Sequence, residues 1–315
     1  MKFKSLLLGT AASLAFAGGN AMAADLSIAE PVDYVRVCDA FGAGFWYLPQ
    51  TDSCFAIGGE VAVGVNFNTG GSHSWDTFIE TEVTTTFSKM TDYGPLTAFM
   101  KWASDGPGYD WYNKEAFISL GNTSFGYYDS VARTGVGFSD SKYKINNVTT
   151  MQVSHVFDLN GATLAVGIQD PYYDSIGGYS NDSPEIAISL EGSAGGVDLF
   201  GGAILALDPT CGDSAYSVGG KASTSVDMLD FVIGGEISNC GGGDADTVFG
   251  GGLKLNLTDD FQVAGDAFID EDDYWWGAVT AYYSVTSGLD FMLNAEFNDV
   301  DGFDGATAKF TAAMP

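Results

Sequence analysis

Segments of about ten residues in which apolar and polar side chains alternate run through this chain from about residue 55 to its end. Successive side chains of a β-strand point to opposite faces, so this period of two predicts strands with one apolar and one polar face. Outside the N-terminal segment there is no apolar run long enough for a membrane-spanning helix. The pattern therefore predicts an all-β fold, in which the apolar faces cover either a soluble core or the lipid-facing side of a barrel.

Sixteen such segments can be delimited by turn-forming residues. In the segment that contains Glu60, for example, Val61, Val63 and Val65 share one face, whereas Glu60, Ala62 and Gly64 share the other. The predicted strands are residues 55–68, 75–90, 94–103, 110–120, 123–128, 148–157, 161–169, 184–192, 196–207, 215–225, 229–239, 247–257, 261–270, 274–286, 289–298 and 305–313.

The connections between these strands differ in length at the two ends. TDYGPL, GN, DLNG, SAGG, SVDML, TDD and TSG are mostly short, and the connections that alternate with them are mostly longer and richer in Asp and Gly. Short turns at one end and long loops at the other are typical of outer-membrane barrels. We therefore predict a transmembrane antiparallel β-barrel of about 16 strands. Aromatic clusters at strand ends suit a membrane interface, although they could also pack a soluble sandwich: Tyr109, Trp111, Tyr112, Tyr274, Trp275, Trp276, Tyr282 and Tyr283.

The N-terminus has the layout of a secretory signal peptide. Lys2 and Lys4 precede a short apolar run that ends in the small-residue motif AMA, which predicts cleavage after Ala23. The expected organisation is a signal peptide at 1–23, a periplasmic-side segment at 24–54 and a barrel at 55–315.

Four cysteines in an exported chain predict disulfides, and three pairings are possible. We favour Cys38 with Cys54, and Cys211 with Cys240. The second pair flanks one predicted hairpin and would lie in neighbouring loops on one rim. The cysteines are too far apart in the sequence for a typical zinc site, and no metal or cofactor is expected.

The chain is strongly acidic, with 41 acidic and 12 basic residues and a formal net charge of −29. Removal of Lys2 and Lys4 with the signal peptide would make it two units more negative. Nucleic acid is excluded as a partner, because binding it requires clustered Lys and Arg. High acidity can also serve solubility alone.

The stretch PVDYVRVCDAFGAGFWYLPQTDSCFAIGGEVAVGVNFN resembles the opening of the alphaproteobacterial porin family, a family of outer-membrane diffusion porins. The resemblance implies a sixteen-stranded barrel in the bacterial outer membrane, a homotrimer, and a third loop that folds inward to narrow the pore. The matching positions include Val35, Arg36, Cys38, Asp39, Gly42, Gly44 and Cys54.

The sequence departs from the family pattern in two respects. The chain ends in KFTAAMP rather than in the terminal Phe that such barrels use for insertion, so Phe310 is the nearest substitute. It also has few arginines, and the wall of clustered arginines that is common in general porins is not evident.

Alternation assigns charged side chains to the polar, water-facing surface of the strands. Because carboxylates outnumber lysines there, we expect passive diffusion of small hydrophilic solutes and ions with a preference for cations. The residues expected to line the pore are Glu60, Glu80, Glu82, Glu236, Asp266, Asp290, Glu296, Lys101, Lys254 and Lys309.

The third loop, 129–146, carries charges of both signs that could form a constriction with a transverse field. An ordinary solvated surface loop is the alternative. The candidate constriction residues are Asp129, Arg133, Asp140, Lys142 and Lys144.

The sequence leaves three other functions to consider as alternatives. An enzyme is disfavoured, because His73 and His155 lie in no catalytic motif. A secreted calcium-dependent adhesin is suggested by the acidic stretches 241–247 and 270–273, which lack the ligand spacing of an EF-hand loop. A substrate-specific or structural outer-membrane barrel cannot be separated from a general porin by alternation.

Overall fold

The computed structural model describes residues 37–69, 75–106, 108–170, 184–206, 215–240 and 245–314. The chain divides into two compact units, residues 1–36 and 37–315, and all described residues belong to the second. The predicted signal peptide, His73, and Cys211 of the predicted Cys211–Cys240 pair lie outside the described residues.

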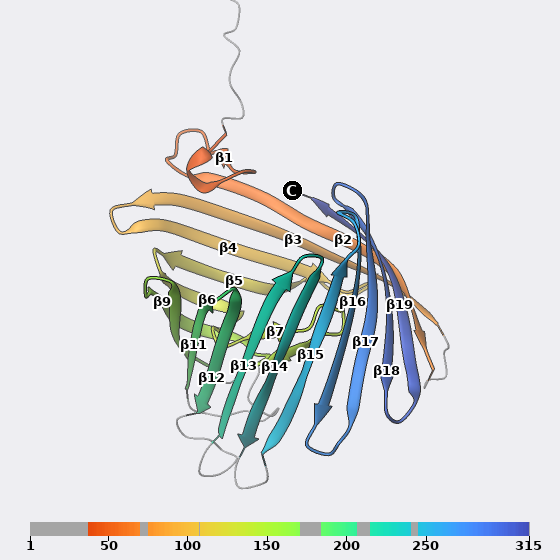
Figure 1. Ribbon diagram of the computed structural model, residues 1–315. Coiled ribbons are helices and arrows are strands. Elements are labelled where there is room, and N and C mark those ends of the chain that lie inside the picture. Colours follow the sequence, from red (N-terminus) through yellow and green to blue (C-terminus); the bar gives the residue numbers. More distant parts are fainter. Residues whose placement is uncertain are drawn as a thin grey trace, which may run out of the picture. The chain divides into compact units, whose positions relative to one another are not determined.

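Sixteen long strands form one closed antiparallel sheet (Figure 1). Each strand pairs with the next along the barrel, and the last pairs with the first, so that Phe310 lies opposite Val63. Closure leaves no unpaired sheet edge, which is what a lipid-exposed sheet requires. The strands are β2 Cys54–Asn68, β3 Asp76–Thr91, β4 Gly94–Ser104, β5 Tyr112–Leu120, β6 Thr123–Asp129, β9 Thr149–Asp158, β10 Ala162–Gln169, β11 Glu185–Ala194, β12 Val197–Ala206, β13 Ala215–Val226, β14 Leu229–Cys240, β15 Asp246–Asn256, β16 Phe261–Asp270, β17 Trp275–Thr286, β18 Leu289–Asn298 and β19 Gly302–Met314.

The predicted sixteen-stranded antiparallel barrel is confirmed, and the strand ends differ from prediction by at most three residues. Four short elements were not predicted: the 3-10 helix η1 Asp39–Phe41 and the strands β1 Trp46–Tyr47, β7 Thr134–Val136 and β8 Tyr143–Ile145. Each has only two or three residues, too few for a period to show in the sequence.

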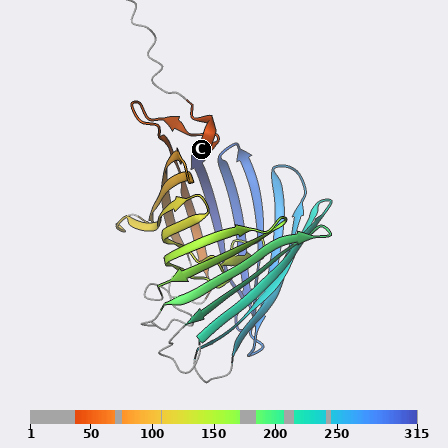
Figure 2. The ribbon, with the colours of Figure 1, turned by 90° about the vertical axis from the view of Figure 1, so that its left-hand side faces the viewer.

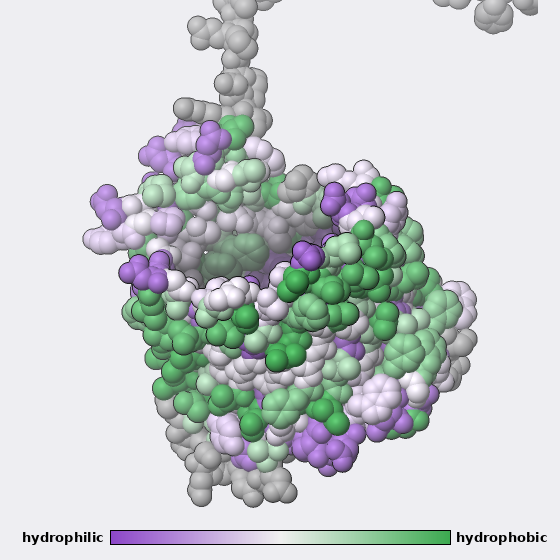
Figure 3. Space-filling model, in the orientation of Figure 1, coloured by the Kyte–Doolittle hydropathy of each residue, from purple (hydrophilic) through white to green (hydrophobic). Residues whose placement is uncertain are grey.

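Large apolar side chains cover the outside of the barrel (Figure 3). Val63 is 45% exposed and Ile233 is 67% exposed, whereas Ala62 and Val232, their neighbours in sequence, are buried on the opposite face. This outer face suits lipid, and the inner face takes the small and polar residues. No helix among the described residues is long and apolar enough to cross a membrane.

Tight turns join the strands at one end of the barrel, at the top of Figure 1, and the longer connections lie at the other end. The turn between β11 and β12 is Gly195–Gly196, with φ of +62° and +84°. Two positive φ angles in a two-residue turn match the twist of the paired strands, and glycine adopts them without strain. Figure 2 shows the same two ends from the side.

The N-terminal segment of the described chain is joined covalently to the barrel. Cys38 and Cys54 form a disulfide, as predicted, and Cys54 is also the first residue of β2. Strand β1 pairs with the start of β2, where Trp46 lies opposite Phe55.

Candidate functional site

The third loop, residues 130–148 between β6 and β9, contains a small hairpin formed by β7 and β8. Val136 and Ile145 on this hairpin are completely buried and pack with Val232 of β14 and Phe268 of β16. Ala132, from the start of the loop, packs in a second buried cluster on β11 and β12. The loop therefore supplies one side of the buried apolar clusters, and the inner face of the barrel supplies the other.

Glycines on the inner face make room for this hairpin. A side chain at Gly219 of β13 would meet Ile145, and one at Gly234 of β14 would meet Val136 at 2.7 Å. A side chain at Gly202 of β12 would meet the backbone of the start of the loop. The glycines let the loop approach the sheet closely.

Asp266 of β16 holds the tip of the loop. Its carboxylate accepts hydrogen bonds from the backbone N–H of Phe138 at 2.8 Å and of Ser139 at 2.6 Å, and it is only 6% exposed. Both donors are backbone groups that would otherwise lack a partner in a buried turn. Tyr282 of β17 donates to the carbonyl of Phe138 at 3.1 Å.

Two further wall carboxylates bind the loop. Glu236 of β14 accepts hydrogen bonds from the Tyr143 hydroxyl at 2.8 Å and from the backbone N–H of Asn146 at 3.1 Å. Ser141 donates to Glu296 of β18. Burial and the nearby Glu236 raise the pKa of Tyr143, so its hydroxyl stays protonated and donates the hydrogen bond to Glu236. These carboxylates, which alternation assigned to the pore lining, contact the third loop.

The wall formed by β3, β4 and β5 carries a compact group of opposite charges. Lys101 lies 2.8 Å from Glu82 and 3.8 Å from Glu115, and Lys114 forms an ion pair with Glu82. Sequence reasoning missed Lys114 and Glu115. By strict alternation Lys114 would share the lipid-facing side with Ile118, but a register shift after Lys101 changes the side to which it points.

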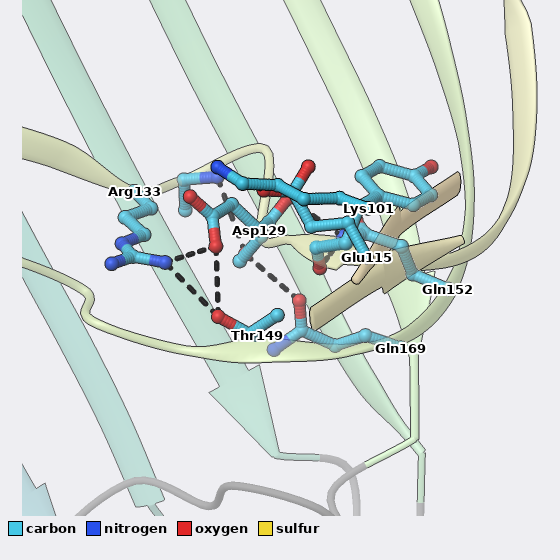
Figure 4. Close-up of polar contacts among 10 residues, drawn as sticks. Lys101, Glu115, Asp129, Arg133, Thr149, Gln152 and Gln169 are labelled. Carbon is cyan, nitrogen blue, oxygen red and sulfur yellow. Dashed lines mark hydrogen bonds and ion pairs between the residues drawn. The ribbon is translucent and has the colours of Figure 1, made fainter. Parts of the chain in front are cut away.

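Arg133 links the start of the third loop to the ends of β6 and β9. Its guanidinium pairs with Asp129 and donates to the Thr149 hydroxyl at 3.0 Å, and Thr149 in turn donates to Asp129 at 2.8 Å (Figure 4). Burial and the proximity of Arg133 lower the pKa of Lys144. Lys142 and Lys144 are exposed and form no hydrogen bond or ion pair with any residue that the structure describes.

The remaining candidate residues lie on the barrel wall, except for Asp140, which belongs to the third loop. Glu60 and Glu80 point to the inner face of β2 and β3, because the residue opposite Glu80 is the buried Ala62. Two lysines are paired: Lys254 lies 2.9 Å from Asp230, and Lys309 lies 3.5 Å from Asp140. Asp290 accepts a hydrogen bond from Ser284 at 2.7 Å.

Residues 25–230 of the chain match the family model described as the Porin subfamily. The chain belongs to this family. Porin Omp2b of Brucella canis is 29% identical over 345 residues, which cover 96% of this chain and 94% of the relative. The putative outer membrane protein y4fJ of Sinorhizobium fredii is 28% identical with the same coverage.

Solved structures agree on the fold of this porin. The outer membrane channel DcaP of Acinetobacter baumannii superposes with a TM-score of 0.72, 11% identity, and coverage of 85% of this chain and 99% of that one. A porin structure refined at 1.8 Å gives a TM-score of 0.61, 13% identity, and coverage of 82% and 99%. The chain is therefore an outer-membrane porin with the fold of a transmembrane channel, as its sequence predicted.

Two aromatic side chains of this porin differ from the expected interface position. Trp276 packs on Tyr143 of the third loop, with ring centroids 6.3 Å apart, and Tyr282 is bonded to the same loop. Both rings therefore lie inside the barrel, against the third loop, and not at the membrane interface. By contrast, Trp275 and Tyr283 are 43% and 47% exposed.

Proposed function

We propose that this porin is a general diffusion channel for small hydrophilic solutes and ions, that its third loop narrows the channel, and that the channel prefers cations. The observation that carries the proposal is the division of the inner wall. One part, from β12 to β16, seats the loop on glycines and on Asp266, and another part, from β3 to β5, carries charged groups.

The narrowing is supported by the number and type of contacts that hold the loop. Val136 and Ile145 are fully buried against the wall, and the three carboxylates of Glu236, Asp266 and Glu296 bind its backbone or hydroxyl groups. An apolar cluster together with charge-assisted hydrogen bonds keeps the loop at one position. Solutes would then pass between the loop and the remaining wall.

The cation preference is supported by the surplus of carboxylates on the inner face. Glu82 is shared by Lys101 and Lys114, and Asp230 and Asp140 each pair with a lysine. Glu60 and Glu80 have no ion-pair partner among the described residues. Unpaired carboxylates in a water-filled lumen attract cations over roughly a Debye length, about 10 Å at 0.1 M salt.

Lys142 and Lys144 of the loop supply charge of the opposite sign. Positive groups on the loop and carboxylates on the wall would give a field across the channel rather than along it. Such a field orders polar solutes and water without any chemical step. We therefore propose no catalysis and no cofactor, and we expect a homotrimer from the resemblance to other porins.

The test is to fold the chain in detergent, insert it into a planar bilayer, and measure single-channel conductance and the reversal potential in a potassium chloride gradient. We expect large current steps in groups of three and a reversal potential of the sign for cation preference. Anion preference would refute the proposed selectivity. Absence of conductance from protein shown to be inserted would refute the open channel.

A further inference from the structure

A cavity of about 380 Å³ lies on the inner wall of the barrel, near the tight turns that join β9 to β10 and β11 to β12. Most of its lining comes from β11, β12 and β13, which lie side by side in the sheet (Figure 1). Its volume is within the range of sites that bind small organic molecules, about 300–1,000 Å³. The lining includes the side chains of Thr163, Glu191, Asp198, Phe200, Lys221 and Ser223.

Three of these residues form a row across the sheet. Glu191 of β11 lies directly opposite Phe200 of β12, and Phe200 lies directly opposite Lys221 of β13. The side chain of Lys221 points into the barrel, because its ammonium donates to the carbonyl of Gly135 in the third loop. Directly paired residues of neighbouring strands point to the same face of a sheet. A negative charge, an aromatic ring and a positive charge therefore follow one another along the inner wall.

The two charges of this row are held apart. Neighbouring strands are about 4.8 Å from each other, so the backbones of Glu191 and Lys221, two strands apart, are separated by about 10 Å. The two side chains attract each other through space, but no ion pair joins them. The cavity that both side chains line is therefore open to a solute between them, over the ring of Phe200.

The charged groups that line the cavity can each bind a solute. Glu191 is exposed and forms no ion pair with any residue in the part of the chain that the structure describes. Asp198, two residues before the ring on β12, accepts a hydrogen bond from Ser193 at one carboxylate oxygen, which leaves the other oxygen for a ligand. The Lys221 ammonium uses one of its three N–H groups on the carbonyl of Gly135, at 3.3 Å, so two N–H groups remain for an anion.

A solute that fits this row carries a positive charge at one end, a negative charge at the other, and a chain between them. A free α-amino acid is too short, because its ammonium and its carboxylate are attached to the same carbon atom. Three residues of extended peptide span about 10 Å, which matches the separation of the outer strands of the row. The hydroxyls of Thr163 and Ser223 line the same cavity and can bind peptide groups, which favours a peptide over a plain alkyl chain.

We propose that this cavity is a binding subsite for short peptides with free termini, in which Glu191 holds the N-terminal ammonium, Lys221 holds the C-terminal carboxylate and Phe200 packs against the middle of the peptide. Asp198 adds to the negative charge at the ammonium end. The subsite adds a solute preference to the proposed channel and rests on that channel only for the route by which the peptide arrives. Binding itself can be measured on folded protein that is not in a bilayer.

The probe is trialanine, which carries both charges at the required spacing. Three comparison ligands each lack one feature: N-acetyltrialanine has no ammonium, trialanine amide has no carboxylate, and alanine has both charges on one carbon atom. Binding to the full chain folded in detergent is measured by ligand-observed NMR titration at about 0.1 M salt and neutral pH, and blockade of single-channel current is measured in planar bilayers. We expect trialanine to bind about fivefold more tightly than N-acetyltrialanine and than alanine, the scale of one charge-assisted contact in the presence of water.

The variants are Glu191→Gln and Lys221→Gln, with Asp227→Asn and Lys89→Gln as matched controls. Asp227, in the turn after β13, and Lys89, on β3, are exposed and do not line the cavity. Glu191→Gln should weaken trialanine binding about fivefold and leave N-acetyltrialanine binding unchanged, because that ligand has no ammonium to lose. Lys221→Gln should weaken trialanine binding about fivefold and leave trialanine amide binding unchanged. Lys221→Arg should keep most of the trialanine binding, because a guanidinium also binds a carboxylate, and Phe200→Ala should weaken all three peptides by similar factors.

Equal binding of trialanine and alanine would overturn the assignment to peptides. A variant that weakens trialanine and its matching blocked peptide by the same factor would indicate a displaced third loop or a general charge effect, and would overturn the subsite. Equal losses in the matched controls would overturn it as well. Protein that binds trialanine in the expected charge-dependent way but passes no current would support the subsite and refute the channel, whereas current without trialanine binding would do the reverse, so the two failures are distinguishable.

Discussion

Replacing Asp266 by alanine should release the tip of the third loop from the inner wall. The carboxylate accepts two backbone N–H groups, from Phe138 and Ser139, at distances of 2.6 to 3.0 Å. The other contacts of the loop remain in this variant, among them the buried Val136 and Ile145. The expected change is therefore local to the turn that follows β7.

The size of the effect follows from the type of hydrogen bond. A bond to a charged group contributes about 1.5–3 kcal/mol, so two of them contribute about 3–6 kcal/mol. Once the tip has left the wall, water in the lumen can bind the freed N–H groups, which favours the lower value of about 3 kcal/mol. Since 1.4 kcal/mol corresponds to tenfold, the equilibrium for attachment of the tip should shift by about 100-fold. Asp266→Asn keeps an acceptor and should give a smaller shift.

Single-channel recording and liposome swelling with sugars of increasing size measure this effect. A released tip should widen the passage and fluctuate within it, so we expect larger conductance, more current noise and faster entry of larger sugars. The matched control is Asp290→Ala, which removes a carboxylate bonded to Ser284 and not to the loop. Equal conductance and noise in wild type and in folded Asp266→Ala protein would refute the reasoning, as would an equal change in the control.

Four further predictions concern other parts of the structure. Gly202→Val should overpack the loop at a cost of about 1–3 kcal/mol and alter conductance, whereas Gly201→Val, on the opposite face of β12 with no atom within 4 Å of the added Cβ, should not. Glu80→Gln should lower the cation-to-anion permeability ratio about twofold, because a carboxylate about 8 Å from a passing ion in water contributes about 0.5 kcal/mol to the energy of that ion; an unchanged reversal potential would contradict this. Cys38→Ser should cost about 3 kcal/mol locally and make the segment before β2 sensitive to protease while the barrel stays folded on gels. The Lys144 ammonium, with its pKa lowered, should lose its proton as pH rises at values below the ordinary 10.5, so the cation-to-anion permeability ratio should begin to increase there, and Lys144→Arg should abolish that increase.

The strands of this porin could be predicted because their cause is local. Alternation such as that of Val61, Ala62 and Val63 places each side chain on lipid or lumen, and turns such as Gly195–Gly196 carry their own conformational signal. The predicted disulfide between Cys38 and Cys54 is confirmed. Strand pairing with neighbours then follows from the short connections.

The arrangement of the third loop could not be predicted from the residues, because it depends on tertiary contacts between residues that are far apart in the sequence. Nothing local distinguishes Gly202 or Gly234, which seat the loop, from Gly201, which meets nothing within 4 Å. The inward position of Lys114 depends on an irregularity in the pairing with β4, which alternation alone does not reveal. Trp276 likewise looks like an interface aromatic until Tyr143 is placed beside it.

The two halves of the inner wall differ because they have different neighbours. The outer face of the barrel gives the comparison: lipid is as apolar as a protein core, so the outer face gains little from specific packing and needs only to be apolar. The third loop is a different neighbour from lipid, because its buried Val136 and Ile145 need a closely fitting surface on the inner wall. A wall of long charged side chains cannot offer such a surface. Glycine on β12 to β15 provides that surface, and the charged side chains of β3 to β5 face water instead. An exchange of the two, with charge at Gly234 and glycine at Glu82, should therefore impair both the seating of the loop and the selectivity of the channel.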